Sequence, residues 1–232
     1  MSFTPASPAS VAVFCIVVAG VILAFLAAVH RAHGPDAISA RHRTFQAAAG
    51  LAAWLGLIIA VVASGKMPSL PLQGLPFFFG GVLVISVAVG FSPLGRRIAF
   101  GIPIAALVAF QTFRLPLELV LHDWAAHGTI PSTMTWTGKN WDIVSGVVAL
   151  LAAPFAGRNR VVAWTANVVG ALLLLNVIRV ALLSTPVPFG WHVTPPLMVA
   201  FHLPYALIGP VCVGGAIAGH IILTRALLRA GS

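Results

Sequence analysis

The chain has 232 residues, of which 59% are hydrophobic and only 7% are charged, with Lys+Arg 13 against Asp+Glu 4. This composition excludes an ordinary soluble domain and is typical of a polytopic membrane protein. The formal charge of +9 does not indicate a nucleic-acid partner, because no soluble segment is long enough to gather the basic residues on one face.

Apolar runs long enough to cross a bilayer recur along the chain. A membrane-spanning helix needs about 17 to 25 apolar residues. The first run follows MSFTPASPAS, which lacks Lys and Arg, so we expect a retained span rather than a cleaved signal peptide. The predicted spans are about 11–30, 44–64, 76–92, 98–121, 142–157, 161–183 and 197–224. They predict an all-α, seven-transmembrane-helix bundle that forms a single integral membrane domain over residues 1–232.

Basic residues divide unevenly between the two sets of alternate connections. One set, with the C-terminal tail, holds nine arginines, whereas the other holds Lys66 and Lys139. Basic connections stay on the cytoplasmic side. The asymmetry therefore predicts an outside N-terminus and a cytoplasmic C-terminus, in a bacterial cytoplasmic (inner) membrane. The nine arginines are Arg31, Arg41, Arg43, Arg96, Arg97, Arg158, Arg160, Arg225 and Arg229.

Two long connections lie on the predicted outer side, at 123–141 and 184–196. They are rich in Gly, Pro, Thr and Trp, and loops of this length are candidates for lids as well as for ordered caps. Four tryptophans fall at the same edge and are interpreted as interfacial anchors. These are Trp124, Trp136, Trp141 and Trp191.

The fourth predicted span carries ionisable groups at helical spacing. In FRLPLELVLHDW, residues 113–124, Arg114, Glu118 and His122 share one helix face, and Gln111 lies on that face one turn earlier. Ionisable groups inside a bilayer must be paired or face protein or water. Polar residues at matching depth in the next three spans are Asn140, Asp142, Asn176, Arg179, His202 and Tyr205. We expect all ten to converge on an outward-facing pocket, with His220 alone in the apolar inner half.

A pocket of this kind is expected to bind a small polar or anionic solute, for transport or for sensing. Arg114 and Arg179 are the expected anion-binding groups. Glu118, His122 and His202 are expected to supply a protonation switch.

Two alternatives use the same residues. One is a membrane-embedded hydrolase or transferase, acid/base or metal-dependent, that acts on a lipid headgroup or lipid-linked substrate, with Glu118, His122 and Asp142 as candidate catalytic groups. The other is a structural subunit in which the buried charges form an ion-pair network that fixes helix register.

A metal site is a weaker interpretation of the same helix face of the fourth predicted span. Glu118 and His122 are spaced to ligate one ion from a single helix face, with His202 or His192 as a third ligand. The sequence contains no HExxH and no cysteine pair, and nearby arginines oppose a divalent cation. No metal or other cofactor is therefore favoured. The expected partners are the lipid bilayer and a small ligand or lipid headgroup.

Overall fold

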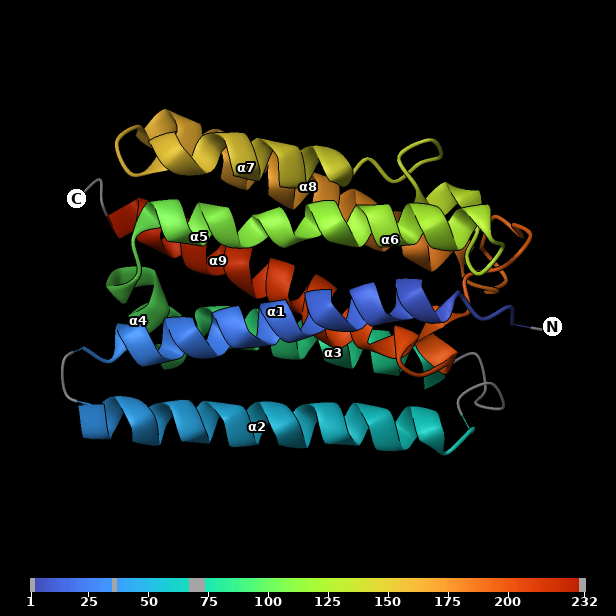
Figure 1. Ribbon diagram of the computed structural model, residues 1–232, viewed down its shortest axis with the longest axis horizontal. Coiled ribbons are helices and arrows are strands. Elements are labelled where there is room, and N and C mark those ends of the chain that lie inside the picture. Colours follow the sequence, from blue (N-terminus) through green and yellow to red (C-terminus); the bar gives the residue numbers. More distant parts are fainter. Residues whose placement is uncertain (1–2, 35–36, 67–73, 230–232) are drawn as a thin grey trace.

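The structure is a computed structural model that describes residues 3–34, 37–66 and 74–229. Helices run side by side along its long axis (Figure 1), and no strand occurs in the described residues. The helices are α1 (Pro8–Ala32), α2 (Ala37–Ala63), α3 (Gly74–Phe91), α4 (Pro93–Gly101), α5 (Ile104–Phe110), α6 (Arg114–Ala126), α7 (Ile143–Ala156), α8 (Arg160–Ser184) and α9 (Gly214–Arg229). A 3₁₀ turn, Gln111–Phe113, joins α5 to α6, and a π-helical turn, Gly209–Val213, precedes α9.

Length and hydropathy confirm the membrane class and the all-helical fold. Within the described part of the chain, five helical segments are long and apolar enough to span a membrane, and a sixth is added when α3 and α4 are taken as one bent span. Helix α7 has 14 residues, fewer than the about 17 that a span needs. The five segments are Pro8–Ala32, Ile38–Ala63, Ile104–Ala126, Arg160–Ser184 and Tyr205–Arg229.

Local sequence signals set where several helices begin. Ser7 and Ser92 each accept a hydrogen bond from the backbone N–H three residues on, and each precedes a proline in the first turn. Asn159 Oδ1 accepts from the first backbone amides of α8. These contacts satisfy N–H groups that have no partner inside the helix.

Helices α3 and α4 meet at a bend of 54°. Arg225 Nη1 donates to Gly90 O at 2.7 Å and to Ser92 O at 3.1 Å, so α9 satisfies carbonyls that the bend leaves open. Only glycine fits at position 95, because a Cβ there would lie 2.6 Å from Val89 O. Exposed Arg96 and Arg97 and buried Ile98 and Ala99 make α4 amphipathic, as in helices that lie at a membrane interface.

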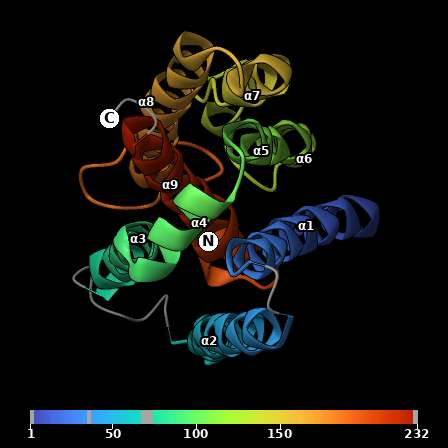
Figure 2. The ribbon, with the colours of Figure 1, turned by 90° about the vertical axis from the view of Figure 1, so that its left-hand side faces the viewer.

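Helix α9 is the centre of the bundle, and α2 lies at its edge. Figure 2 shows α9 surrounded by α3, α4, α5 and α8, and it contacts all four. Helix α2 contacts chiefly α1, and its apolar window is the least buried of the five spans. Most of the surface of α2 therefore faces the bilayer.

The elements that carry the nine arginines gather at one end of the bundle, here called the arginine-rich end. The end of α1, the start of α2, α4, the α7–α8 connection and the end of α9 lie there, whereas the connections α6–α7 and α8–α9 lie at the other end (Figure 1). Arg160 Nη2 donates to Leu227 O at 2.5 Å, and the Arg229 guanidinium lies 4.3 Å from the Phe100 ring centroid.

Prolines shift two of the predicted spans. The fourth begins at Ile104 rather than at 98, because Ile102 precedes Pro103 and is extended. The seventh begins at Tyr205 rather than at 197. Position 204 is a proline, which lacks a backbone N–H, and His202 has φ −129 and ψ 134, outside the helical region. The expectation that His202 lies on the last span is therefore wrong.

Trp124 is not an interfacial anchor. Its side chain is fully buried, and its ring makes edge contacts with Phe14 at 5.1 Å and Tyr205 at 4.9 Å between centroids. Trp141, in contrast, is 57% exposed, which suits a side chain at the membrane interface. The helix continues to Ala126, so Trp124 belongs to α6 and not to the following connection.

Close packing of α7 on α6 gives a stability prediction. A Cβ at Gly146 would lie 2.7 Å from Leu115 Cγ and 2.8 Å from Leu115 N. Gly146→Ala should therefore destabilise the protein by about 1 to 3 kcal/mol, measured as a lower unfolding temperature in detergent. Gly157→Ala is the matched control, because its Cβ would meet only Ala105 Cβ, at 3.7 Å. Equal unfolding temperatures for the two variants would contradict the close approach.

Candidate functional site

A buried ion pair joins α6 to α7. Arg114 begins α6 and Asp142 immediately precedes α7, and their residues are 1% and 4% exposed. Arg114 Nε donates to Asp142 Oδ2 at 2.6 Å, and Arg114 Nη2 donates to Asp142 Oδ1. Ser145 Oγ also donates to Oδ1, at 2.9 Å. The two parallel bonds form the bidentate arrangement that guanidinium and carboxylate groups favour.

The third nitrogen of Arg114 reaches α8 and α9. Its Nη1 donates to Gly170 O at 3.0 Å and lies 3.2 Å from His220 Nε2. A guanidinium has no acceptor, so His220 Nε2 accepts, and the ring proton is on Nδ1. This tautomer suits the contact of Nδ1 with Asn167 Oδ1 at 2.9 Å, in which His220 donates.

The polar chain continues toward the arginine-rich end. Asn167 Nδ2 donates to Thr224 Oγ1 at 2.7 Å, and Thr224 Oγ1 donates to His220 O at 2.8 Å. Asn167 and Thr224, rather than another histidine, are thus the neighbours of His220 at this depth. Gly170 permits its approach, because a Cβ at Gly170 would lie 2.6 Å from His220 Cε1. The sequence could have indicated that Asn167 and His220 meet. Both are polar residues in the apolar half of a predicted span, where a polar group needs a partner.

Glu118 lies one turn after Arg114 and is held by the connection that follows α6. Its Oε1 accepts from Asn140 Nδ2 at 2.9 Å; Asn140 also donates to Met134 O and accepts from the Asp142 N–H. Both Glu118 and Asn140 are essentially inaccessible to solvent. Glu118 Oε2 is buried and has no hydrogen-bond partner among the described residues. A buried carboxylate oxygen without a donor is costly.

A cavity of about 190 Å³ lies beside these groups. Arg114, Glu118 and Asp142 line it, and nearly all other lining side chains are apolar and come from α3, α6, α8 and residues 197–216. Its size is close to that of an apolar protein cavity of about 150 Å³ that holds benzene. The site therefore combines a small apolar volume with one carboxyl group whose second oxygen has no hydrogen-bond partner among the described residues.

Gln111 lies on the same face of the chain, one turn before Arg114. Its Nε2 donates to Ala216 O at 3.5 Å, and its Oε1 is buried without a partner in the part of the chain that the structure describes. The structure thus brings five of the predicted site residues into one interior region. They are Gln111, Arg114, Glu118, Asn140 and Asp142.

Asn176 and Arg179 lie outside this region. Arg179 is exposed and Asn176 is partly buried. Asn176 Nδ2 donates to Lys139 O at 2.8 Å, Arg179 Nη2 donates to Asn176 Oδ1 at 2.8 Å, and the Arg179 guanidinium lies 5.8 Å from the Trp191 ring centroid. Arg179 follows Gly170 by nine residues, about 13 Å along α8. Arg114 and Arg179 therefore do not face one cavity.

The remaining predicted residues hold aromatic and terminal segments in place. His122 stacks on Trp136, with 4.1 Å between ring centroids, and His202 stacks on Phe3 at 3.9 Å. Partial burial lowers the pKa of the His202 imidazole below its ordinary value. The Tyr205 hydroxyl accepts a hydrogen bond from the backbone N–H of residue 6 at 2.9 Å. These three side chains hold the N-terminal segment and the α6–α7 connection in place, and none of them lines the cavity.

The first of the two long connections, a candidate lid or ordered cap, packs against the end of the bundle. In the connection after α6, Ile130, Met134 and Asn140 are buried. Thr133 Oγ1 and Ser184 Oγ are 2.7 Å apart and share a hydrogen bond between this connection and the last residue of α8. The first connection therefore covers the Arg114–Asp142 pair.

The predicted metal site needs Glu118, His122 and His202 to surround one ion. In the structure each of the three side chains contacts a different partner. Glu118 is held by Asn140, whereas His122 and His202 stack on different aromatic rings. No group of three or more His, Cys, Asp or Glu residues is placed to hold a metal ion within residues 3–34, 37–66 and 74–229.

Comparisons with family models, with curated proteins and with solved structures give no match for this chain. Its function must therefore be argued from its own residues.

Removal of Arg114 should be far more damaging than removal of a surface arginine. Arg114→Leu leaves Asp142 buried without its cation, and loss of one partner of a buried pair costs about 3 to 5 kcal/mol. Arg97→Ala, at an exposed position, should change stability by less than about 0.5 kcal/mol. Unfolding in detergent checks both variants.

A double variant tests the pairing directly. Arg114→Leu combined with Asp142→Leu removes both charges, so it should be more stable than Arg114→Leu alone. Additive losses would show that the two side chains act independently.

Proposed function

We propose that this chain is a seven-span protein of a bacterial cytoplasmic membrane, with its N-terminus outside. The concentration of nine arginines at one end of the bundle supports this orientation. Helix α7 brings the number of spans to seven, because it runs beside α8 and, with the connection that precedes it, joins the two ends of the bundle (Figure 1). The connections after α6 and α8 then lie outside.

The bundle binds a small polar solute in the cavity beside Glu118. The observation that carries this proposal is the buried Glu118 Oε2, which has no donor within the described residues and belongs to a side chain that lines a cavity of about 190 Å³. A solute that donates a hydrogen bond to this oxygen would relieve the cost of leaving it unpaired. The apolar walls would enclose the rest of the molecule.

The groups around the cavity favour a donor rather than an anion. Each nitrogen of Arg114 already has a partner, in Asp142, Gly170 or His220. An anion would have to displace one of these partners and approach two carboxyl groups. An amine or hydroxyl group on a body of about the size of benzene fits both the spare carboxylate oxygen and the volume.

The polar chain from Arg114 to Thr224 supports a role in transport or sensing. It leads from the cavity toward the arginine-rich end through His220 and Asn167. Occupation of the cavity by a cation would change the field at Arg114, and through it the hydrogen bond to His220. A solute bound at one end of the bundle would thus influence groups nearer the other end.

A structural role is the second candidate. The specific observation in its favour is the bidentate Arg114–Asp142 pair, whose donors and acceptors satisfy one another within the bundle. Paired polar groups of this kind fix the register of packed membrane helices. In that case Glu118 completes the network and the cavity binds nothing.

Three probes of similar size distinguish these functions. Benzylammonium, benzyl alcohol and benzoate differ only in the group that they offer to Glu118. Benzylammonium should raise the unfolding temperature most and benzoate least, with about 2.7 kcal/mol of stabilisation at one hundred times Kd. Glu118→Gln should remove most of the benzylammonium effect. Asp123→Asn should retain it, because the Asp123 side chain is 41% exposed and pairs with His127.

Stronger stabilisation by benzoate than by benzylammonium would show that the cavity prefers anions. Equal unfolding temperatures with and without all three probes, in a protein that Glu118→Gln destabilises, would favour the structural role.

Labelling from outside intact cells tests the orientation. Lys139 and Arg96 are both exposed and lie at opposite ends of the bundle. With Cys15 and Cys212 replaced by alanine, a membrane-impermeant maleimide should label Lys139→Cys in intact cells. It should label Arg96→Cys only after permeabilisation. The reverse pattern would invert the orientation and place the Glu118 cavity on the cytoplasmic side.

A further inference from the structure

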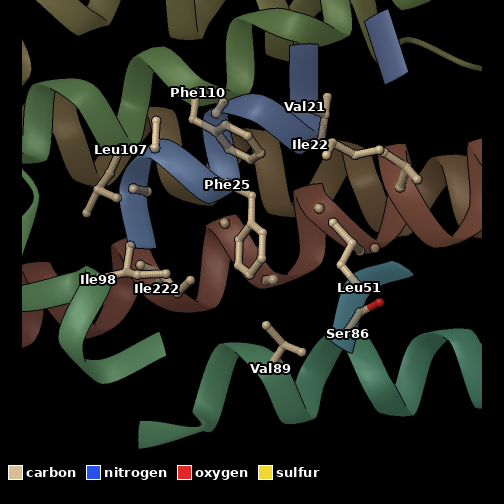
Figure 3. Close-up of a pocket in the computed structure, with 18 of the residues that line it drawn as sticks. Val21, Ile22, Phe25, Leu51, Ser86, Val89, Ile98, Leu107, Phe110 and Ile222 are labelled. Atoms are coloured by element: carbon tan, nitrogen blue, oxygen red, sulfur yellow. The ribbon is translucent and has the colours of Figure 1, made fainter. Parts of the chain in front are cut away.

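A second cavity, of about 450 Å³, lies on another face of α9. Helices α1, α2, α3, α4 and α5 contribute to its other walls, and the side chains in Figure 3 show its apolar character. Ser86 is the one labelled residue with a side-chain oxygen, and its hydroxyl donates to Val82 O of its own helix at 2.7 Å. The cavity therefore suits a hydrocarbon group.

The cavity has the length of one membrane leaflet. On α1 its lining extends from Val21 to Arg31, ten residues or about 15 Å along the axis. The hydrocarbon core of a bilayer is about 30 Å thick, so the acyl chains of one leaflet occupy about half of it. An extended acyl chain can therefore lie along α1 within this space.

A cation lies at one end of the cavity. Arg31 is in the last turn of α1, is exposed, and lines the cavity at the arginine-rich end of the bundle. The amphipathic helix α4 contributes Ile98 to the wall, and such helices lie at the level of lipid headgroups. An apolar slot that ends at a cation beside the interface matches an anionic amphiphile.

Exposed lining residues show that the slot reaches the surface of the bundle, because Ile85 of α3 lines the cavity and is 38% exposed. Leu51 and Trp54 of α2 face Ile85 and Val89 of α3 across it. Ala106, on α5, lines the cavity and is exposed, so its methyl group faces empty space. A lipid can enter here without the unfolding of any helix.

We propose that this cavity is a binding site for one anionic phospholipid. One acyl chain lies between α1, α2, α3 and α9, and the phosphate-bearing headgroup lies at Arg31. The lipid fills the space between α2 and the rest of the bundle. The proposal goes beyond the solute site at Glu118 and does not depend on it, since the two cavities have different walls.

Native mass spectrometry of the full chain in detergent tests the proposal. Phosphatidylglycerol and phosphatidylcholine with identical acyl chains are the probes. One phosphatidylglycerol should remain bound, about fivefold more tightly than phosphatidylcholine, as expected for one basic residue at the membrane surface. Arg31→Gln should abolish this preference, whereas Arg97→Gln, at an exposed position that does not line the cavity, should preserve it.

A cavity-filling variant tests the acyl-chain site. Ala106→Phe should lower binding of both lipids at least about tenfold, because the ring occupies the slot. Ala88→Phe is the control, since Ala88 is exposed on α3 and is not part of the lining. Equal retention of lipid by the two variants would overturn the proposal. So would inorganic phosphate that competes fully, or a dimer that Ala106→Phe dissociates.

If Ala106→Phe does not fold, fluorescence quenching provides a second test of the acyl-chain site that does not need this variant. Trp54 lines the cavity, so phosphatidylglycerol with brominated acyl chains should quench it. The quenched component should be missing in Trp54→Phe. Quenching that is equal in the presence and absence of Trp54 would contradict a chain at this position.

Discussion

The buried pair of Arg114 and Asp142 is the constraint on which the packing of α6, α7, α8 and α9 depends. A guanidinium inside an apolar bundle must have its charge and its N–H groups satisfied by protein. Its partners come from α7, α8 and α9. Because each hydrogen bond has a preferred direction, the pair fixes how these four helices are rotated about their axes and how they are shifted along them relative to one another. Small residues make this possible, since Gly146 and Gly170 leave room for α6 and for His220.

The same pair decides which group remains to meet a ligand. Arg114 is engaged on all three nitrogens, and Asp142 is held by Arg114 and Ser145. Glu118 has only the Asn140 amide on one oxygen. The positive charge of Arg114, which from the sequence is expected to bind an anion, is therefore already paired within the protein. The other oxygen of Glu118, Oε2, has no hydrogen-bond partner among the described residues, and the proposed solute site depends on this oxygen.

Helix α9 separates two cavities of different chemistry. The cavity beside Glu118 is small, has three ionisable residues in an otherwise largely apolar lining, and includes Cys212 and Ala216 in its wall. The larger cavity is apolar, ends at Arg31, and includes Gly215 and Gly219 in its wall. Side chains at those two glycines would approach Val21 and Phe110 to 3.1 Å. The small residues of the last helix thus serve both close packing and the larger cavity.

The amino-acid sequence determined the properties that depend on local composition and helical period. Hydropathy gave the membrane class, the spacing of arginines gave one basic end, and a four-residue period placed Arg114 and Glu118 on one face. The limits of the fourth and seventh spans were misplaced because hydropathy does not register Pro103 or Pro204, which break helices without lowering apolar character.

Only the tertiary structure decided which polar residues meet. Arg179 and Asn176 turn to the surface of α8, whereas Asn167 and His220, from the apolar half of the spans, join Arg114. In a membrane the residues that face lipid are as apolar as those that face the interior, so the sequence of one helix does not specify its rotation about its axis. That rotation is set by contacts with helices distant in the chain.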